Sequence, residues 1–536
     1  MIIIFVWVAV LLAVLFVYYR QIYSKFNRYG VKHFKPVPFL GNMTRILFRV
    51  DHSVENIVRL YASFPEERFV GRYEFTQEIV VIRDIELVKK IGVKDFEHFL
   101  DHRALFGFGE TFFSRSLIAL EGQEWKDMRS TLSPAFTSSK IRLMVPFIVE
   151  VGDQMIRSLK KKIDESKTGY IDVECKDLTT RYTNDVIASC AFGLKVDSHN
   201  NVDNEFYAMG KLSTTFSFRQ VLLFIVLMSI PSAISKVSSL EWLLANTKKK
   251  YRNVYLKLVL ETMRDRETRK IIRPDMIHLL MEAKKGKLTH EDIQSNDEAA
   301  GFATVEESTV GQKQVNRVWT ENDLIAQAVL FFIAGFETVS TTMSFLLYEL
   351  AVNPDVQERL VQEIKETDAK NGGKFDFNSI QNMPYMDMVV SEVLRLWPPA
   401  DTLDRICTKD YNLGKPNEKV EKDFIVHKGT AIAIPVYAIH RDPQYFPNPD
   451  KFDPERFSDD NKYNIQTFTY MPFGVGPRNC IGSRFALCEI KVMAYQILQH
   501  IEISPCEKTT IPAKLCKQSV NLILEGGHWL RFRPRS

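Results

Sequence analysis

An uncharged stretch at the start of the chain predicts a membrane-spanning helix. Residues Ile2 to Tyr19 carry no charged side chain, and Arg20 ends the run. At about 1.5 Å rise per residue, a helix over this run approaches the ~30 Å hydrocarbon thickness of a bilayer. No basic segment precedes the run and no small-residue cleavage site follows it, which argues against a cleaved signal peptide. We therefore expect a retained transmembrane anchor over residues 1–20.

Positive charge and proline follow this run. By the positive-inside rule, a basic stretch after a single span predicts that the rest of the chain stays in the cytosol. Pro36 and Pro38 restrict the backbone, which predicts a stiff hinge over residues 21–41. The basic residues that support this topology are Arg20, Lys25, Arg28, Lys32 and Lys35.

A second long apolar pattern predicts a helix buried in the protein core. From Leu324 to Ile333 nearly every side chain is apolar, so apolar groups surround the helix instead of forming one stripe. We expect one core helix from Asp323 to Leu350. Residues Phe216 to Ile230 are also apolar but too few for a second span, and both a buried helix and a helix in the membrane interface fit them.

Two other patterns complete the organisation of the chain. Tyr73 to Ile82 has the composition of a strand, which predicts a small sheet early in the chain. Lys284 to Thr320 is rich in Gly, Ser, Asn, Glu and Lys, which predicts a long surface loop.

Composition narrows the function. The formal net charge of +4 predicts no nucleic-acid partner. Seven cysteines, an odd number scattered along the chain, predict reduced thiols and not a disulfide framework. No glycine-rich dinucleotide or phosphate motif stands in the sequence, so redox chemistry here would need electrons from a partner.

One cysteine lies in a loop that is typical of a metal ligand. Three glycines and a proline between Phe473 and Gly482 forbid a regular element, and good helix formers follow. Cys480 therefore precedes a helix N-terminus, near the Arg478 guanidinium, and we expect this environment to favour the thiolate. One thiolate cannot form a structural zinc site, whereas a haem iron that activates oxygen needs one. The alternative is a buried, inert cysteine.

The predicted core helix contains a second unusual stretch, Ala334 to Thr338. Gly335 in a helix interior costs about 1 kcal/mol relative to Ala. Ala334 and Thr338 share one face, and the Thr338 hydroxyl can bond back to the Ala334 carbonyl and loosen the helix. A groove beside one hydroxyl results. The alternative is a notch where another helix crosses.

Two further pairs have helical spacing. Trp125 and Arg129 are four residues apart, and they form either a cation–π pair on the surface or a joint site for an anion. Glu392 and Arg395 are three residues apart among apolar neighbours, which predicts a buried ion pair.

Taken together, these motifs resemble those of cytochrome P450 monooxygenases. Phe473-x-x-Gly476-x-Arg478-x-Cys480-x-Gly482 resembles the haem-binding pattern of that family. The other motifs are Trp-x-x-x-Arg at 125–129, Ala-Gly-x-Glu-Thr at 334–338, Glu-x-x-Arg at 392–395 and Pro-Glu-Arg-Phe at 454–457. The resemblance implies a mainly α catalytic domain with small β-sheets over 42–536, of the membrane-anchored microsomal type. The block 302–308, Phe-Ala-Thr-Val-Glu-Glu-Ser, resembles a loop of insect P450s linked to toxin metabolism, which favours that branch.

The resemblance also implies roles for single residues. Glu337 and Thr338 would deliver protons to bound oxygen, and Cys480 would bind the iron of haem b. Glu392, Arg395 and Arg456 would support the haem pocket. The haem contacts would be Trp125, Arg129, Ala334, Gly335, Arg405, Phe473, Arg478, Cys480 and Gly482. The substrate would contact Phe106, Phe108, Phe112, Phe113, Phe336, Thr402 and Leu403.

The implied activity is insertion of one oxygen atom from O2 into lipophilic small molecules, most simply xenobiotics, at the endoplasmic reticulum membrane. NADPH would supply electrons through NADPH–cytochrome P450 reductase, with cytochrome b5 and membrane lipid as further partners. The acidic reductase would meet a basic surface made of Lys126, Lys140, Arg142, Arg484 and Lys491. Oxidation of an endogenous lipid or hormone, a haem-thiolate isomerase or dehydratase and a non-catalytic haem protein are the alternatives.

Overall fold

The computed structural model describes residues 2–103, 113–214, 257–286, 302–305, 310, 319–372 and 376–535. The chain divides into two compact units. Unit 1 comprises Met1–Arg103, Phe216–Asn246 and Thr402–Ile439, and unit 2 comprises Ala104–Thr215, Thr247–Asp401 and His440–Ser536. The apolar segment 216–230 lies outside the described residues. The catalytic domain over 42–536 stays a prediction.

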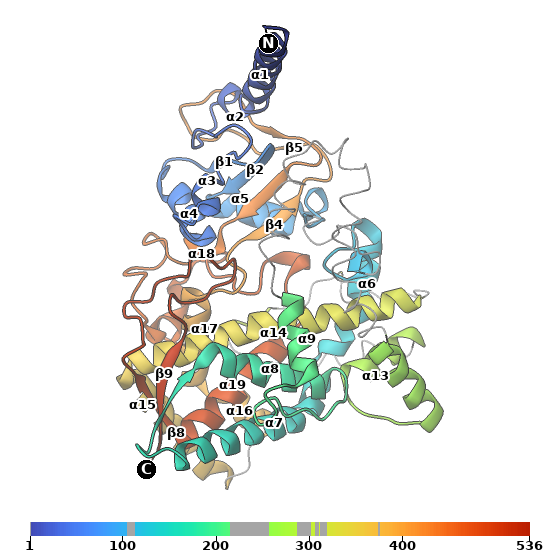
Figure 1. Cartoon of the computed structure of the whole chain (residues 1–536), viewed down its shortest axis with the longest axis vertical. Coiled ribbons are helices and arrows are strands. Elements are labelled where there is room, and N and C mark those ends of the chain that lie inside the picture. Colours follow the sequence, from blue (N-terminus) through green and yellow to red (C-terminus); the bar gives the residue numbers. More distant parts are fainter. Residues whose placement is uncertain are drawn as a thin grey trace. The chain divides into compact units, whose positions relative to one another are not determined.

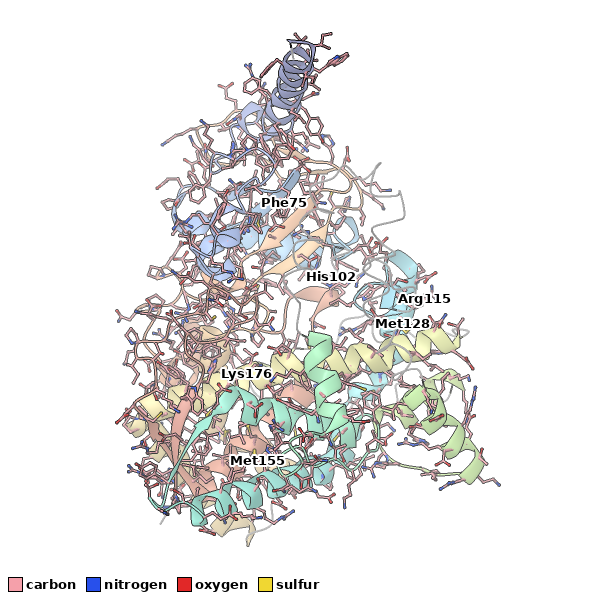
Figure 2. All side chains as sticks on the ribbon, in the orientation of Figure 1. Phe75, His102, Arg115, Met128, Met155 and Lys176 are labelled. Carbon is pink, nitrogen blue, oxygen red and sulfur yellow. The ribbon has the colours of Figure 1, made fainter. Side chains whose placement is uncertain are left out.

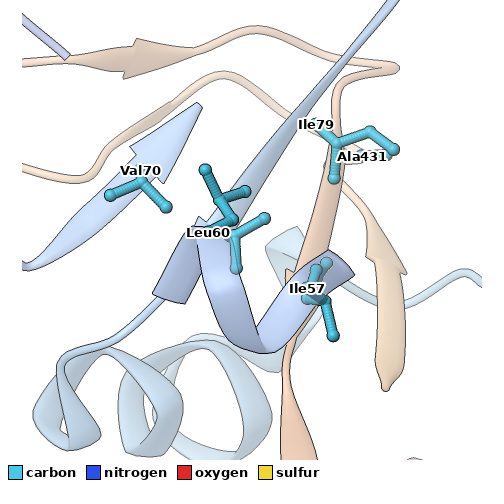
Figure 3. Close-up of a cluster of buried hydrophobic side chains, with 7 residues drawn as sticks. Ile57, Leu60, Val70, Ile79 and Ala431 are labelled. Atoms are coloured by element: carbon cyan, nitrogen blue, oxygen red, sulfur yellow. The ribbon is translucent and has the colours of Figure 1, made fainter. Parts of the chain in front are cut away.

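Unit 1 is built on a four-stranded sheet with the order β1-β2-β7-β4 (Figure 1). β2 pairs antiparallel with β1 and parallel with β7, and β4 pairs antiparallel with β7. The helix α4 (Ser53–Ala62) packs Ile57 and Leu60 against Val70, Ile79 and the strand β7 (Figure 3). The strands are β1 (Phe69–Glu74), β2 (Gln77–Ile82), β4 (Leu403–Ile406) and β7 (Ala431–Ile434), with a separate pair β5 (Tyr411–Asn412) and β6 (Ile425–Val426).

The predicted strand over Tyr73–Ile82 is part of a hairpin. A turn at Phe75 and Thr76 separates β1 from β2, and Phe75 has a φ angle of 56°. The sequence prediction located the sheet and missed the turn, because these two residues are not among the usual turn formers. The helical segments of unit 1 are α1 (Ile2–Ile22), α2 (Lys25–Arg28), α3 (Thr44–Leu47), α4, α5 (Ile85–Lys89), η1 (Lys90–Lys94), η2 (Phe96–His98) and α18 (Val436–Ile439).

The amino-terminal segment packs onto the sheet of unit 1. Tyr19, Tyr23 and Phe26 are buried. The ring centres of Tyr23 and Phe26 both lie 4.9 Å from that of Tyr73 on β1, and the Tyr23 hydroxyl donates to the Phe75 carbonyl over 3.0 Å. Aromatic side chains therefore fix the predicted hinge to the sheet. The proline pattern did not predict these aromatic contacts. The part of α1 before Tyr19 exposes large apolar side chains, namely Ile3, Ile4, Phe5, Val6, Trp7, Val10, Val14, Phe16, Val17 and Tyr18.

Unit 2 is mainly helical, and α14 (Glu321–Val352) packs against both α8 and α19 (Figure 1). Thr320 caps α14 by accepting from the Asp323 N–H, and Asp323 accepts from the Thr320 N–H in return. The other α-helices are α6 (Gly122–Leu132), α7 (Ser138–Asp164), α8 (Cys175–Cys190), α9 (Glu205–Thr214), α13 (Met276–Lys284), α15 (Pro354–Asn371), α16 (Phe377–Gln381), α17 (Pro384–Leu396) and α19 (Ser483–His500).

A three-stranded antiparallel sheet with the order β3-β9-β8 completes unit 2. Its strands are β3 (Ile171–Glu174), β8 (Ile501–Pro505) and β9 (Trp529–Pro534). Residues 257–269 are also helical. Short turns are η3 (Phe113–Arg115), η4 (Ser133–Phe136), η6 (Pro454–Phe457), η7 (Lys462–Asn464) and η8 (Gly476–Arg478).

The predicted core helix matches α14 within two residues at each end. In the described part of the chain, α14 is also the helix whose length and hydropathy would suffice to cross a bilayer, but 67% of its apolar stretch is buried inside the protein. The predicted surface loop over 284–320 needs a correction, because Ala303, Val310 and Trp319 are buried.

Candidate functional site

The cysteine loop, Phe473–Gly482, is a shaped backbone that ends at α19. Gly474 and Gly476 have φ angles of 83° and 69°, in the left-handed region that favours glycine. The Cys480 N–H donates to the Phe473 carbonyl over 2.8 Å and closes the loop. Gly482 is the residue that precedes the first turn of α19. The sequence therefore predicted both the loop and the helix after it.

The residue Cys480 keeps solvent-accessible surface, although Arg478 and Asn479 before it are buried. Protein atoms crowd around the thiol, and the resulting loss of bulk water raises its pKa, whereas the Gly482 N–H and the Arg129 guanidinium lower it. The helix terminus and Arg129 thus favour the thiolate as expected, but burial outweighs them and raises the net pKa of the thiol. Coordination to a metal cation deprotonates a thiol in such a place.

Two buried arginines border the cysteine loop. Arg129 on α6 donates from its two Nη atoms to the carbonyl and to the Oδ1 of Asn479, both over 2.7 Å. The guanidinium carbon of Arg478 lies 4.0 Å from the ring centre of Trp125. The structure thus brings Trp125, Arg129 and Arg478 together, with Arg478 as the cation that lies over the Trp125 ring. Two buried positive charges make this region suitable for an anionic group.

Two exposed residues interrupt the burial of α14. Between Asp323 and Val352, these are Ala334 and Thr338, and the Thr338 hydroxyl donates to the Ala334 carbonyl over 2.6 Å. Gly335 faces α8, where an added Cβ would lie 3.0 Å from Cδ1 of Ile187. The two interpretations of this stretch, a groove beside a hydroxyl and a notch for a crossing helix, therefore both apply, but to different residues. Ala334 and Thr338 form an open face with one hydroxyl, and Gly335 permits a close helix crossing.

Glu337 is held by groups from two other segments. Its Oε1 lies 3.0 Å from Lys176 Nζ on α8, labelled in Figure 2, and accepts from Asn521 Nδ2 over 3.0 Å. Lys176 also donates to the Ser340 hydroxyl over 2.7 Å. Burial lowers the pKa of Lys176, and the nearby Glu337 carboxylate opposes that shift. Lys176 and Asn521 could not be predicted as partners of Glu337, because both are distant along the chain and nothing in their local sequence marks them.

Phe136 connects the two predicted motifs. Its ring centre lies 5.2 Å from that of Phe331, one turn before Ala334 on α14. A Cβ added to Gly482 would lie 3.8 Å from the same ring. One aromatic side chain therefore touches both α14 and the cysteine loop. The local sequence of Phe136 carries no signal for this position.

A backbone segment forms a second connection. The Leu117 N–H donates to Gln327 Oε1 on α14 over 2.8 Å, and the Leu117 carbonyl accepts from Arg478 over 3.4 Å. Arg115, labelled in Figure 2, pairs with Asp323 over 2.9 Å. The sequence did offer a signal here, since Gln327 is a polar residue within an otherwise apolar run.

Glu392 and Arg395 form a fully buried ion pair. Arg395 donates from Nε to Glu392 Oε2 over 2.7 Å and from Nη2 to Oε1 over 2.8 Å. Its Nη1 donates to the His440 carbonyl over 2.7 Å. Arg456 Nε lies 3.4 Å from Glu392 Oε1, and the Asp453 N–H donates to the same oxygen over 2.9 Å. The structure therefore brings the three predicted support residues together.

Three predicted site residues belong to unit 1. Arg405 on β4 is buried and donates from Nη1 to the Asp404 carbonyl over 2.6 Å, and burial lowers its pKa. Thr402 and Leu403 precede it and are partly exposed. Asp404 accepts from the Arg103 N–H over 2.6 Å, which fixes the strand next to Arg405. Their assigned roles toward haem and substrate stay predictions.

The predicted substrate residues in the glycine-rich stretch after Asp101 are not part of the described structure. Phe106, Phe108 and Phe112 lie outside the described residues, and Phe113 begins η3 without a described side chain.

The structure corrects the assignment of Phe336. Its side chain is 1% exposed, and its ring centre lies 5.5 Å from that of Phe332. A Cβ added to Gly210 on α9 would lie 2.5 Å from the Phe336 ring, so α9 covers this face of α14. Phe336 is therefore a core residue. It lies on a different side of the helix from the exposed Thr338.

The basic surface predicted for a reductase also changes. Arg142 is exposed, and Lys126, Lys140 and Arg484 are partly exposed. Lys491 is fully buried and lies 3.1 Å from Asp387 Oδ1. Lys491 therefore cannot meet a partner protein, because its charge is neutralised inside unit 2.

The chemistry of these groups fits a haem better than a metal cluster. In the described part of the chain, no three His, Cys, Asp or Glu side chains come together to hold a metal ion. All seven cysteines are free thiols, and Cys480 is the exposed one. A single sulfur ligand beside two buried guanidinium groups suits an iron with one axial thiolate and anionic propionates. A structural zinc site would need more ligands.

Comparisons with known proteins agree with this donor set. Residues 31–311 and 303–529 match the family model described as cytochrome P450. The chain is 44% identical over 523 residues to cytochrome P450 9e2 of Blattella germanica, covering 95% of this chain and 94% of that protein. It is 40% identical over 520 residues to the probable cytochrome P450 9f2 of Drosophila melanogaster, covering 95% of each. Identity to cytochrome P450 6k1 of Blattella germanica is 35% over 526 residues, covering 98% and 95%.

Proposed function

This chain belongs to the cytochrome P450 family and is a monooxygenase, and on that premise we propose that it inserts one oxygen atom from O2 into lipophilic small molecules, among them xenobiotics. The observation that carries the proposal is that Phe136 lies against two segments. One is α14 at Phe331, one turn before the exposed Ala334–Thr338 face, and the other is Gly482, two residues after the accessible Cys480. The insect P450 relatives and the block 302–308 favour foreign compounds as substrates over an endogenous lipid or hormone.

The residues of the cysteine loop would hold the haem. Cys480 would ligate the iron, Arg129 and Arg478 would provide positive charge for the propionates, and Trp125 would add an indole N–H donor. When bound, a thiolate-ligated haem supplies the activation of O2 and its insertion into C–H bonds. The family resemblance implies that Arg405 would also bind a propionate.

Thr338 and Glu337 would take part in proton delivery to the bound oxygen. The Thr338 hydroxyl donates to the Ala334 carbonyl, so its oxygen lone pairs stay available to accept a proton donor on the exposed side of α14. The Glu337 carboxylate is fixed by Lys176 and Asn521. Proton delivery from Glu337 therefore requires either a rotation of its side chain away from Lys176 or transfer through that lysine.

The amino-terminal helix would anchor the protein in the endoplasmic reticulum membrane. The exposed apolar side chains of α1 before Tyr19 support a single span, and the basic residues after it support a cytosolic catalytic domain. Because Tyr19, Tyr23 and Phe26 pack onto unit 1, the span would be joined stiffly to the sheet.

Electrons would come from NADPH through NADPH–cytochrome P450 reductase, with cytochrome b5 as an assisting donor. Lys126, Lys140, Arg142 and Arg484 would form the docking surface for the acidic reductase, without Lys491. Turnover at limiting reductase is expected to fall with added salt, because interactions between exposed charges are screened. An Arg142→Glu variant is expected to raise the reductase concentration needed for half-maximal turnover.

The experiment that tests the proposed function uses the full chain in lipid vesicles with reductase, NADPH and a panel of lipophilic compounds under isotopically labelled O2. We expect products that carry one labelled oxygen atom and depend on NADPH. Omitting the reductase is the control. Products that form without NADPH or without labelled oxygen would contradict the proposal and favour an isomerase or dehydratase.

A further inference from the structure

The block Phe302–Val305 packs against the part of unit 2 that supports the cysteine loop. The ring centre of Phe302 lies 5.1 Å from that of Phe457 in η6 and 5.5 Å from that of Tyr470. The rings of Phe457 and Tyr470 lie 4.9 Å apart, so the three form one aromatic cluster. Ala303 is buried. The match to the family model comes in two pieces that overlap at residues 303–311.

A polar contact fixes the same block to two helices. The Phe302 N–H donates to Asp387 Oδ2 on α17 over 2.8 Å. The other oxygen of Asp387 lies 3.1 Å from Lys491 on α19. Asp387 thus joins the block to α17, which carries the Glu392–Arg395 pair, and to α19, which follows Cys480.

The aromatic cluster continues through His440 to the backbone of Met471, which precedes the cysteine loop in the chain. The His440 ring stacks on that of Tyr470, with ring centres 5.4 Å apart and planes 23° apart. His440 Nε2 accepts from the Met471 N–H over 2.9 Å, so its Nδ1 carries the proton and donates to the Arg395 carbonyl over 3.1 Å. The neutral ring needed for this pattern agrees with burial, which lowers the pKa of His440 to about 3. Met471 lies two residues before the cysteine loop.

We propose that Phe302 is a positioning residue for the axial thiolate. Its ring holds Tyr470 against His440, His440 holds the Met471 N–H, and the chain from Met471 leads directly into the loop that ends at Cys480. Phe302 acts through Tyr470 and His440 and is assigned no contact with haem or substrate. Its effect is to keep the backbone around Cys480 in the conformation that presents sulfur to the iron. This inference rests on Cys480 as the haem ligand under the proposed function.

The test compares Phe302→Ala with wild type in the full-length holoenzyme, using the carbon-monoxide spectrum of the reduced protein as the readout. Loss of two aromatic contacts is expected to increase about tenfold the rate at which the thiolate-type spectrum is lost on mild heating. Amide hydrogen exchange at Met471 and Cys480 is expected to accelerate similarly. Phe302→Tyr keeps the ring and is expected to restore both values. Phe48→Ala, which removes an exposed phenylalanine of unit 1, is the matched control and should behave as wild type.

The outcomes separate positioning from general stability. If Phe302→Ala unfolds at lower temperature but retains the thiolate-type spectrum until it unfolds, with unchanged exchange at Met471, the proposal is wrong. If Phe302→Ala yields no folded protein, Phe302→Leu is measured by the same two readouts, with a smaller increase expected and no increase contradicting the proposal. A wild-type spectrum without the thiolate signature would instead contradict the proposed function, because Cys480 would then not be the ligand.

Discussion

Two ion pairs of unit 2 differ in what surrounds them. Glu392 and Arg395 are both 0% exposed, and the other N–H groups of Arg395 donate to backbone carbonyls. Glu337 and Lys176 are 22% and 12% exposed, and their close other partners are side chains, namely Asn521, Ser340 and Thr341, with one longer contact of 3.5 Å from Lys176 to the Glu337 carbonyl. Water cannot replace the contacts of the buried Glu392–Arg395 pair. It can replace those of the partly exposed Glu337–Lys176 pair.

This difference in surroundings distinguishes a pair with a structural role from a pair whose acid can take part in proton transfer. A buried pair with backbone partners has one arrangement, because breaking it leaves an unpaired charge away from water. A partly exposed pair with side-chain partners can rearrange at low cost, since water and hydroxyl groups replace the lost contacts. The geometry therefore agrees with a fixed frame at Glu392–Arg395 and with an adjustable acid at Glu337.

The largest effect is expected from breaking the fixed pair. Arg395→Leu leaves the Glu392 carboxylate buried with Arg456 as its remaining cation, and should lower the free energy of unfolding by about 3–5 kcal/mol. Denaturant titration measures this loss. The double variant Glu392→Leu/Arg395→Leu removes both charges and should lose less than the sum of the single variants. Equal stability of Arg395→Leu and wild type would show that the pair is not fixed by burial.

Glu349 is a buried carboxyl group without a bonded cation, and it makes the stability of the protein depend on pH. Glu349 accepts from the Trp397 indole N–H over 2.7 Å, and burial raises its pKa from 4.5 to about 7. Between these values the unfolded chain releases a proton that the folded protein keeps. Stability from this group is therefore complete below pH 4.5 and is lost as pH rises to about 7, by about 3 kcal/mol. Glu349→Gln should remove that slope, as urea titrations across this pH range would detect.

The adjustable pair should tolerate substitution with a smaller loss of stability. Lys176→Met leaves Glu337 with Asn521, Thr341 and water, so the free energy of unfolding should fall by about 1 kcal/mol or less. The share of consumed NADPH that appears in product should fall up to about tenfold, a fraction of the ~10²–10⁴-fold effect of a positioned acid–base group. Lys161→Met, at an exposed pair with Glu165, is the control. If Lys176→Met lowers the free energy of unfolding by several kcal/mol, this pair is as fixed as Glu392–Arg395 and the prediction is wrong.

The smallest effect concerns the notch beside the adjustable pair. Gly335→Ala gains helix propensity of up to about 1 kcal/mol, but its Cβ would press on Ile187. We expect near-zero net change in thermal unfolding for the single variant. Combined with Ile187→Val, which removes the contacting methyl group, the same alanine should raise stability. Additive effects of the two substitutions would mean that the crossing at Gly335 is not tight.

Local patterns predicted α14, the helix after Cys480 and the buried Glu392–Arg395 pair on its helix, because each depends on residues close in sequence. They also predicted the cysteine loop. The sequence could not predict the partners of Glu337, since Lys176 and Asn521 come from segments 161 and 184 residues away. It also misjudged Lys491 and Phe336, because which side of a helix is covered depends on packing by α17 or α9. The docked block at Phe302 was missed for the same reason, as its polar flanks resemble an exposed loop.

The central claim is that the sulfur of Cys480 is the ligand of the haem iron. Cys480→His should still bind haem, since the buried arginines and Trp125 remain, but an imidazole would replace the thiolate. The reduced carbon-monoxide complex should then lose the thiolate-type spectrum, and product formation with reductase and NADPH should stop. A Cys480→His protein with the wild-type spectrum and normal turnover would contradict the account.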